Sequence, residues 1–300
     1  MLTPQWFSRR MNSRKWTGER PVLIHALDGF LGAGSGPRIA AEQLRSGHGE
    51  VVHTFDLDAM YDYRARRPPI AFRGDHYQDY DEPRLDVVLE HDRGGRPYLL
   101  LAGPEPDFGW EGFIAETRGV IEEFDVPLTV GLASVPMGVP HTRPLVITAH
   151  GNRAELVDRQ NLWSTEVTVP SSAQALLEYR LGQEGHDAVG FVVHVPHYLA
   201  QIEYPTAALA LLDALLDRVP LDIEVDDLRA RQQETLAEIE QQIQEQNGAV
   251  LLSGLEEQYD AFTRGAAQSL LASDDALPSG DELADQFEQF LARIRQDDDE

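Results

Sequence analysis

The sequence predicts an α/β protein: a three-layer αβα sandwich with a mostly parallel sheet, followed by a C-terminal α-helical appendage. Short segments rich in Val, Ile and Leu alternate with segments of helical periodicity between residues 21 and 220. Several of the short segments are apolar at successive positions, which is typical of strands buried on both faces. Beyond residue 220, apolar residues recur only at spacings of three and four, which predicts helices.

The expected strands are the apolar runs bounded by turn-forming residues. They lie at residues 22–27, 51–57, 85–91, 97–102, 128–134, 145–150, 166–169 and 188–195. Residues 93–96, Arg-Gly-Gly-Arg, indicate a hairpin between the third and fourth of these strands. Residues 58–84 are rich in Asp, Tyr, Arg and Pro and show little periodicity, so they predict a long surface loop.

The expected helices of this region are residues 38–45, 110–124, 171–183 and 206–218. Pro37 suits the first turn of the first helix, and Ser171 with Gln174 forms a capping box for the third. Ligands of such sheets bind beyond the carboxyl ends of the strands. We therefore expect the connecting loops to gather at that edge, namely residues 28–37, 103–109, 135–142 and 196–204.

Charge divides the chain. The net charge is −26, and the last 80 residues hold 21 acidic residues against five Arg. This shift predicts four parts: a basic arm (1–20), an α/β domain (21–220), an acidic helical appendage (221–296) and an acidic tail (297–300). Three amphipathic helices are expected in the appendage. The first ends at Asn247-Gly248, the second starts near residue 252, and the third, at 279–294, opens with a capping box.

Composition excludes several classes of function. The absence of cysteine rules out disulfides and thiolate chemistry and fits a cytoplasmic location. No apolar run approaches the ~20 residues of a membrane span. The negative net charge repels phosphate backbones and anionic lipids, so neither a nucleic acid nor a membrane is an expected partner.

One candidate site is the glycine-rich turn after the first strand, formed by Asp28, Gly29, Phe30, Gly32 and Gly34. A strand, a glycine-rich turn and a helix can present backbone N–H groups to a phosphate. The dinucleotide fingerprint is incomplete, because its third glycine, counted from Gly34, falls on an isoleucine. A Walker loop is absent as well. A tight turn without a nucleotide is the favoured interpretation, and no cofactor is expected.

The second candidate is the loop that contains Pro196, His197 and Tyr198. His194 and His197 could bind zinc together with Glu203. Pro196 separates the two histidines, however, so no helix fixes their geometry. The favoured alternative is that His197 hydrogen-bonds a loop carbonyl while His194 packs on the sheet. No Gly-x-Ser-x-Gly nucleophile motif occurs either. We therefore expect no catalytic residue and no metal ligand.

Four segments resemble the proteasome assembly chaperone 2 family, in the form found in actinobacteria. They are residues 26–34 (Ala-Leu-Asp-Gly-Phe with Gly-Ala-Gly), 136–144 (Pro-Met-Gly-Val-Pro-His-Thr-Arg-Pro), 176–179 (Leu-Leu-Glu-Tyr) with 190–191 (Gly-Phe), and 195–199 (Val-Pro-His-Tyr-Leu) with 204–205 (Tyr-Pro). The Pro-His-Tyr segment is the most distinctive. The resemblance covers about residues 20 to 220.

This resemblance implies a phosphorylase/hydrolase-like αβα domain that self-associates. Separately, we expect a trimer, and the helical appendage is a candidate for the trimer or dimer contacts. Eukaryotic relatives act as paired chaperones of the proteasome α-ring, so proteasome subunits are the implied protein partner. Relatives that dock through a C-terminal hydrophobic-Tyr-x tail differ from this chain, which ends Asp298-Asp299-Glu300. The leading hypothesis is a non-enzymatic, assembly-chaperone-like protein. The alternative is a small-molecule or nucleotide-binding enzyme that uses the glycine turn and the Pro-His-Tyr loop.

Overall fold

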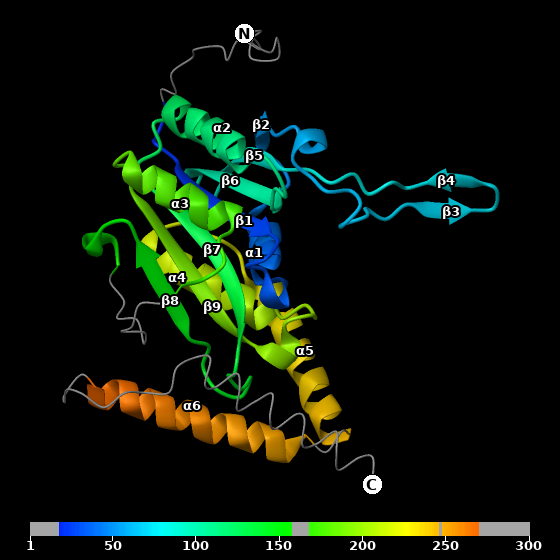
Figure 1. The fold of residues 1–300 in the computed structure, drawn as a ribbon, viewed down its shortest axis with the longest axis vertical. Coiled ribbons are helices and arrows are strands. Elements are labelled where there is room, and N and C mark those ends of the chain that lie inside the picture. The colour runs from blue at the N-terminus through cyan, green and yellow to red at the C-terminus, as the bar shows by residue number, and fades with distance from the viewer. Residues whose placement is uncertain (1–17, 158–167, 246–247, 270–300) are drawn as a thin grey trace.

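A seven-stranded mixed sheet forms the centre of the computed structural model, which describes residues 18–157, 168–245 and 248–269 (Figure 1). In spatial order the strands are β2 (Glu50–Thr54), β5 (Asp86–His91), β6 (Pro97–Pro104), β1 (Val22–Asp28), β7 (Thr129–Met137), β9 (Ala188–Pro196) and β8 (Ile147–Gly151). Seven of the expected strands are thus present.

The four central strands, β6, β1, β7 and β9, are parallel. On one side β5 and β2 follow antiparallel, and β8 pairs antiparallel with β9 on the other. The expectation of a mostly parallel sheet therefore needs correction, since three of the six pairings are antiparallel. The Arg-Gly-Gly-Arg hairpin accounts for one of them, because so short a connection can join only antiparallel neighbours.

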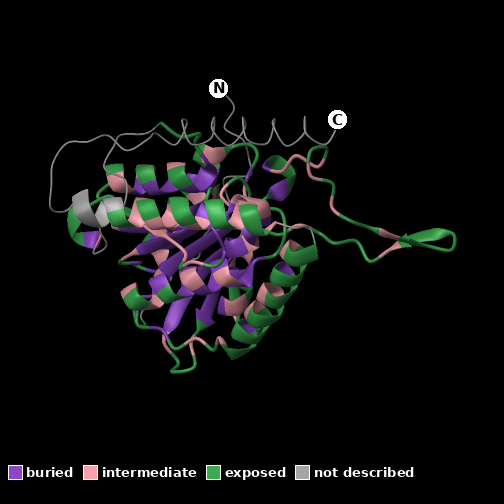
Figure 2. Cartoon of the chain, turned by 90° about the horizontal axis from the view of Figure 1, so that it is seen from below, coloured by how far each residue is buried: buried purple, intermediate pink, exposed green. Residues whose placement is uncertain are grey.

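Helices cover both faces of the sheet and produce the expected three layers (Figure 1). They are α1 (Gly36–Leu44), α2 (Trp110–Glu123), α3 (Ala173–Gln183), α4 (Pro205–Arg218), α5 (Asp226–Glu245) and α6 (Ala249–Ser269). α1 and α4 lie on one face, and α2 and α3 lie on the other. Figure 2 shows that the buried residues lie in the sheet and on the inward sides of these helices.

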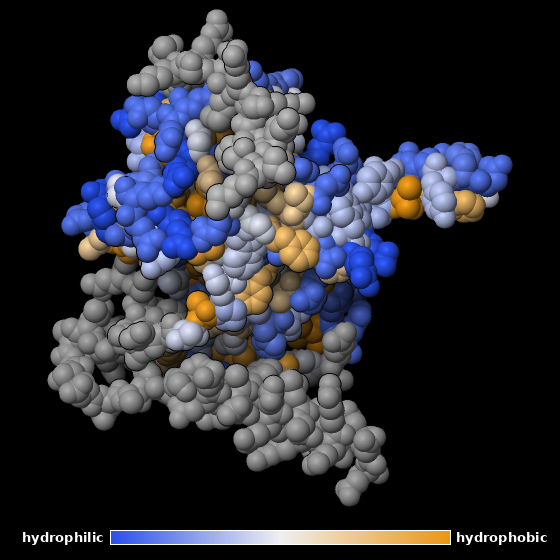
Figure 3. All heavy atoms as spheres, turned by 45° about the horizontal axis from the view of Figure 1, so that its top comes forward, coloured by the Kyte–Doolittle hydropathy of each residue, from blue (hydrophilic) through white to orange (hydrophobic). Residues whose placement is uncertain are grey.

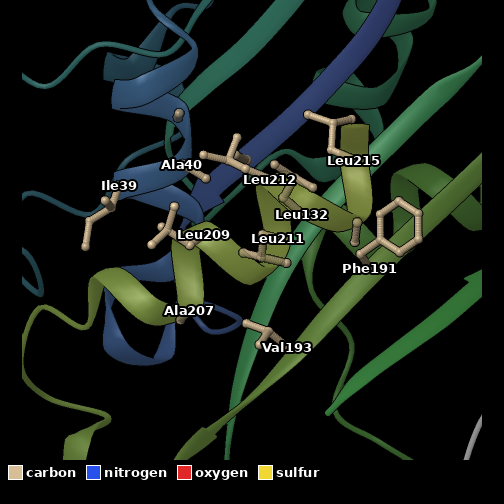
Figure 4. Close-up of a cluster of buried hydrophobic side chains, with 14 of the residues drawn as sticks. Ile39, Ala40, Leu132, Phe191, Val193, Ala207, Leu209, Leu211, Leu212 and Leu215 are labelled. Carbon is tan, nitrogen blue, oxygen red and sulfur yellow. The ribbon is translucent and has the colours of Figure 1, made fainter. Parts of the chain in front are cut away.

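Each face of the sheet has its own hydrophobic core. Along β1, Ile24 and Ala26 belong to the core under α1 and α4, whereas Leu23 and Leu27 belong to the core under α2 and α3. This alternation is the period of two of a strand. In Figure 4, side chains of β7 and β9 meet leucines of α4 and residues of α1. Each fully buried leucine contributes roughly 1.5–3 kcal/mol to stability, which makes these layers the main source of folding energy.

The segment expected to be a plain surface loop carries a hairpin instead. β3 (Ala71–Arg73) pairs with β4 (His76–Gln78) around a turn in which Gly74 has φ +67°. The hairpin projects from the body as a separate arm (Figure 1). Its strands span three residues each and are mostly exposed, so the sequence lacks the alternating pattern that marks a half-buried strand.

The helical appendage is joined to the α/β body through α5. Leu228 and Ile239 of α5 are buried in the same core as α4. Among the described residues, no helix combines the length and the hydrophobicity needed to cross a membrane. The helix expected at 279–294 and the tail at 297–300 lie outside the described residues, as does most of the basic arm. Of the strand expected at 166–169, residues 166 and 167 lie outside the described residues, and 168 and 169 are not in a strand.

The cap of α3 differs from its expected form by one residue. Ser172, not Ser171, is the N-cap, and its hydroxyl accepts a hydrogen bond from the Ala175 amide at 3.0 Å. Gln174 does not complete the expected capping box. Its side-chain amide donates to the Leu132 carbonyl at 3.3 Å, so this residue ties the helix to β7 instead.

Candidate functional site

The loops that follow β1, β6, β7 and β9 meet at one edge of the sheet, as their positions predicted. The Glu105 amide donates to the Asp28 carbonyl at 2.9 Å, and the Ser134 amide donates to the Leu31 carbonyl at 2.9 Å. The Gly34 amide donates to the Ala200 carbonyl at 2.8 Å. The two candidate loops are therefore neighbours, held together largely by backbone hydrogen bonds.

The side chain of Glu105 connects this edge to α3. Its Oε2 accepts from the Phe30 amide at 2.9 Å, and its Oε1 accepts from the Ala173 amide, the first of α3, at 2.7 Å. A carboxylate at a helix N-terminus also interacts favourably with the helix dipole. A Cβ on Gly29 would lie 2.2 Å from Oε2, so the glycine of Asp-Gly-Phe is required because the carboxylate occupies that space.

Replacing Glu105 by alanine is expected to lower the free energy of unfolding by about 1–3 kcal/mol, because two backbone amides lose their acceptor. Chemical denaturation measures the loss. Glu111→Ala is the control, since Glu111 pairs only with Arg180 on the exposed surface of α2 and should change stability little. Equal stability of the two variants would contradict the role assigned to Glu105.

A cavity of about 410 Å³ opens beside this carboxylate. Its lining is Asp28, Gly29, Phe30, Arg66, Glu105 and Asp107. Of these residues only Arg66 is cationic, and it donates to the Glu105 carbonyl at 2.6 Å and to Asp107 Oδ2 at 2.5 Å while lying over the Tyr61 ring. The positive charge is thus already paired. Beyond the Arg66–Asp107 pair the lining holds two more carboxylates, those of Asp28 and Glu105, which disfavours a phosphate and favours a cationic group.

The glycine turn is closed by the chain itself. Gly34, with φ +64°, donates its amide to Ala200 and accepts at its carbonyl from the Tyr204 amide at 2.9 Å. The Ser35 amide donates to the Gly32 carbonyl at 3.0 Å, and Gly32 forms a bridge with Ser134. A Cβ on Gly34 would lie 3.0 Å from the Cβ of Tyr204. The turn is glycine-rich because another segment packs against it, and these donors do not converge on a ligand.

The Pro-His-Tyr loop follows β9 as a short 3-10 turn, His197–Leu199. The Tyr198 hydroxyl accepts from the His141 amide at 2.9 Å and lies 2.7 Å from Nδ1 of the same histidine. Burial raises the pKa of Tyr198 to about 12, so the phenol stays protonated. His197 is partly buried, and burial lowers the pKa of its imidazole, so the neutral form is favoured. Tyr198 thus connects the loop after β9 to the loop after β7.

The three zinc candidates do not converge. His194 Nε2 lies 2.9 Å from the Thr148 hydroxyl, and burial lowers the pKa of His194 to about 4. Glu203 instead binds Arg38 at 2.5 Å and Arg231 at 3.1 Å. Within the described part of the chain, no three His, Asp or Glu side chains are placed to share a metal ion.

α6 is attached to the loop after β7. Arg143 donates from Nε and Nη2 to the two carboxylate oxygens of Asp260, both at 2.9 Å, and from Nη1 to Glu256 at 3.2 Å. The Tyr259 hydroxyl donates to the Pro144 carbonyl at 2.7 Å. Bidentate Arg–carboxylate pairs are among the most directional polar contacts. Arg143 therefore fixes both the position and the orientation of this helix.

Arg143→Ala is expected to loosen α6 on the body, because the helix loses its bidentate contact, although it keeps the hydrogen bonds of Tyr259 with Pro144 and of Glu256 with Thr142. Limited proteolysis would then cleave within 249–269 several-fold faster than in the wild type. Arg153→Ala removes a surface pair with Asp187, neither of whose members belongs to α6, and should leave the cleavage rate unchanged. An unchanged rate in the Arg143 variant would show that the remaining contacts are enough to hold the helix.

Sequence reasoning missed Glu105, Arg66 and Arg143. Glu105 follows Gly-Pro at the end of a strand, which is a recognisable position, but its partners lie 75 and 68 positions away in the chain. Arg66 lies in a segment without periodicity, where nothing distinguishes one arginine from the next. Arg143 belongs to the segment that resembles the family, and its acidic partners sit on a helix more than 100 residues later.

These features define an αβα protein whose strand-end loops bind one another and whose C-terminal helices are attached to the same loops. The chain belongs to the PAC2 family, whose model matches residues 26–243. The matched range includes the Asp-Gly-Phe turn, the Pro-His-Tyr loop and the segment that contains Arg143.

Solved structures of actinobacterial proteins are similar to this chain. A Mycobacterium tuberculosis protein of unknown function, Rv2714, is 46% identical, with 82% of this chain and 87% of that one covered and a TM-score of 0.79. A Corynebacterium glutamicum protein of unknown function is 34% identical over 83% and 94%, with a TM-score of 0.77. The Mycobacterium tuberculosis proteasome-assembly chaperone homologue Rv2125 is 27% identical over 74% and 95%, with a TM-score of 0.68. None of the curated proteins matches the chain.

Proposed function

We propose that this chain is a non-enzymatic interaction protein, chaperone-like in its mode of action, that works as a homo-oligomer. The observation that carries the proposal is the β3–β4 hairpin, which projects from the body (Figure 1) and carries two exposed aromatic residues, Phe72 and Tyr77. The family membership supports it, since relatives include a proteasome-assembly chaperone homologue.

The hairpin has the properties of a docking arm. Phe72 and Tyr77 face each other across the two strands, with ring centroids 5.2 Å apart, and are 60% and 70% exposed. Figure 3 shows hydrophobic residues on this arm, among hydrophilic ones. A lone two-stranded hairpin is at best marginally stable in water, so it gains from packing against another surface. Exposed aromatic residues are enriched at protein interfaces.

A second copy of the chain is the proposed occupant of the hairpin. Each copy carries the same arm, so copies that exchange arms form a closed, symmetric assembly with every arm covered. Ile70 and Tyr80 flank the hairpin and are 47% and 49% exposed, which extends the apolar surface beyond the two rings. The arm thus exposes four large apolar or aromatic side chains, Ile70, Phe72, Tyr77 and Tyr80, that a second copy could cover.

The geometry of the strand-end edge argues against the enzyme alternative. A nucleotide site at the glycine turn needs free backbone donors, whereas the amides of Phe30, Gly34 and Ser35 donate within the chain. The neighbouring cavity exposes three carboxylates and one paired arginine, which is unfavourable for a phosphate. Proteasome subunits remain the proposed protein partner, by analogy with the relative named above.

Light scattering coupled to size-exclusion chromatography tests the proposal on the full-length wild-type chain. The expected result is the mass of a small oligomer that decreases on dilution. A single-chain mass at every concentration would contradict the self-association. A parallel thermal-shift screen with nucleotides is expected to leave Tm unchanged, and a concentration-dependent rise would favour the enzyme alternative.

A further inference from the structure

A row of four residues crosses the sheet beneath α3, and it is buried except at its His150 end. His25 of β1 pairs with Gly131 of β7, Gly131 pairs with Gly190 of β9, and Gly190 pairs with His150 of β8. The row thus reads His-Gly-Gly-His across four adjacent strands. Glu178 of α3 lies above its centre, between the two histidines.

The two glycines create the space that Glu178 occupies. A Cβ on Gly131 would lie 2.3 Å from Glu178 Oε1 and 2.7 Å from the His25 ring. A Cβ on Gly190 would lie 2.4 Å from the His150 ring and 3.1 Å from Glu178 Oε1. Side chains at either position would therefore displace the carboxylate. The two glycines leave a space on this face of the sheet, and the carboxylate of Glu178 from α3 fills it.

The two histidines differ in their contact with Glu178. His150 Nε2 is 2.5 Å from Glu178 Oε2, whereas His25 Nε2 is 3.6 Å from Oε1. His25 is fully buried, and the groups that act on its ring are Glu178, His150 and the side chain of Gln174. The side chain of His150 is 44% exposed, so it can exchange protons with solvent. His150 therefore forms a pair with Glu178 that solvent can reach, whereas His25 lies beside the same carboxylate in the interior.

The pKa shifts follow from this placement. Burial lowers the pKa of His25, and the attraction of Glu178 does not offset it. Burial also acts to lower the pKa of His150, but the hydrogen bond and charge of Glu178 outweigh it and raise the pKa. Burial acts to raise the pKa of Glu178, but the hydrogen bond from His150 prevails and lowers it. The favoured state is a protonated His150, an ionised Glu178 and a neutral His25.

We propose that His150 and Glu178 form a proton-dependent latch that holds α3 on the sheet, and that a loosening of α3 also loosens the strand-end loops attached to it. The link to the loops is Glu105, which binds both the first amide of α3 and the amide of Phe30. When His150 loses its proton, the buried carboxylate loses its counter-charge, and a buried charge without a partner is strongly destabilising. α3 then loosens, and the Asp-Gly-Phe turn loosens with it.

Within residues 18–157, 168–245 and 248–269, few other charged or polar groups face Glu178. β1 contributes His25, β8 contributes His150, and β7 and β9 contribute only the two glycines of the row. On α3 itself the neighbouring polar side chain is Gln174. α2 reaches α3 through the surface pair of Glu111 with Arg180, on the exposed side of the helix. The latch therefore depends on His150 for its positive charge.

The direction of the pH dependence follows from these shifts. The pKa of His150 is raised on folding, so its stabilisation is complete below the ordinary value of 6.5 and is lost as pH rises through the raised value. The pKa of Glu178 is lowered, so its contribution is complete above the ordinary value of 4.5 and is lost as pH falls through the lowered value. His25 must stay neutral, which costs stability as pH falls below 6.5. The latch is thus expected to open on the alkaline side.

Hydrogen exchange of the full chain from about pH 6 to about pH 9, corrected for intrinsic exchange rates, tests the latch. We expect a several-fold loss of protection in α3 and at the Phe30 amide as pH rises. His150→Gln should show low protection without this pH dependence. His53→Gln is the matched control, because His53 forms a comparable pair with Glu116 at 3.0 Å on β2 and should retain the wild-type dependence. Constant protection in the wild type, or an unchanged dependence in His150→Gln, would overturn the proposal.

A second measurement does not depend on whether the His150 variant folds. Nuclear magnetic resonance titration of the wild-type histidine rings is expected to show His150 losing its proton above the ordinary range and His25 remaining neutral throughout. A protonated His25, or a His150 that titrates below the ordinary value, would refute the charge assignment on which the latch rests.

Discussion

A Gly131→Ala variant is expected to lose about 3–5 kcal/mol of unfolding free energy, the cost of breaking a buried ion pair. The new Cβ would lie 2.3 Å from Glu178 Oε1 and 3.0 Å from His25 Nε2, and both neighbours are buried. The carboxylate must leave its position, and its hydrogen bond with His150 breaks with it. Urea denaturation followed by circular dichroism measures the loss.

Gly112→Ala provides the matched control for this substitution. Gly112 lies within α2, and a Cβ there would meet nothing within 4 Å. Alanine should therefore stabilise the helix by about 0.5–1 kcal/mol. The same chemical change is thus expected to have opposite signs at the two positions. A Gly131 variant as stable as the wild type would mean that Glu178 can reorient at no cost, and the row would have no structural role.

A Phe72→Ser/Tyr77→Ser double variant is expected to dissociate the oligomer completely, so that light scattering gives the mass of a single chain. The two rings are the main apolar surface of the arm, and the removal of a few central aromatic anchors commonly abolishes an interface. The fold itself should persist, because the hairpin lies outside both hydrophobic cores. The circular dichroism spectrum of the variant is therefore expected to match that of the wild type.

Tyr179→Ser is the control for this experiment. Tyr179 lies on α3 and is 60% exposed, like Phe72, but it is not part of the arm. Its replacement should leave the oligomer intact. A double variant that keeps the wild-type mass would locate the interface elsewhere on the molecule, and loss of the oligomer in the Tyr179 variant would point to α3.

The buried elements of the fold were predictable from the sequence because burial leaves a pattern. β1 and β9 are apolar at successive positions because both faces of each strand are covered. α4 presents leucines at spacings that match its buried side. The strand-end loops could be placed at a common edge for the same reason, since alternating strands and helices determine where their connections fall.

Features that depend on register or on distant contacts were not predictable in this way. The sequence shows Gly131 and Gly190 as ordinary glycines within strands, and only the pairing of four strands aligns them with His25 and His150. The antiparallel direction of β8 depends on its pairing with β9 and leaves no mark in its composition. The hairpin was missed because its exposed strands carry no burial pattern.

Hydrogen exchange of the wild-type hairpin at two protein concentrations tests the account most directly. If the arm binds a second copy of the chain, the amides of residues 70–81 are protected at the concentration where the oligomer forms and exchange rapidly after dilution. Protection in β1 and β9 should remain the same at both concentrations, because these strands lie in the core. Rapid exchange of the hairpin at every concentration would contradict the claim that this protein acts through the projecting arm.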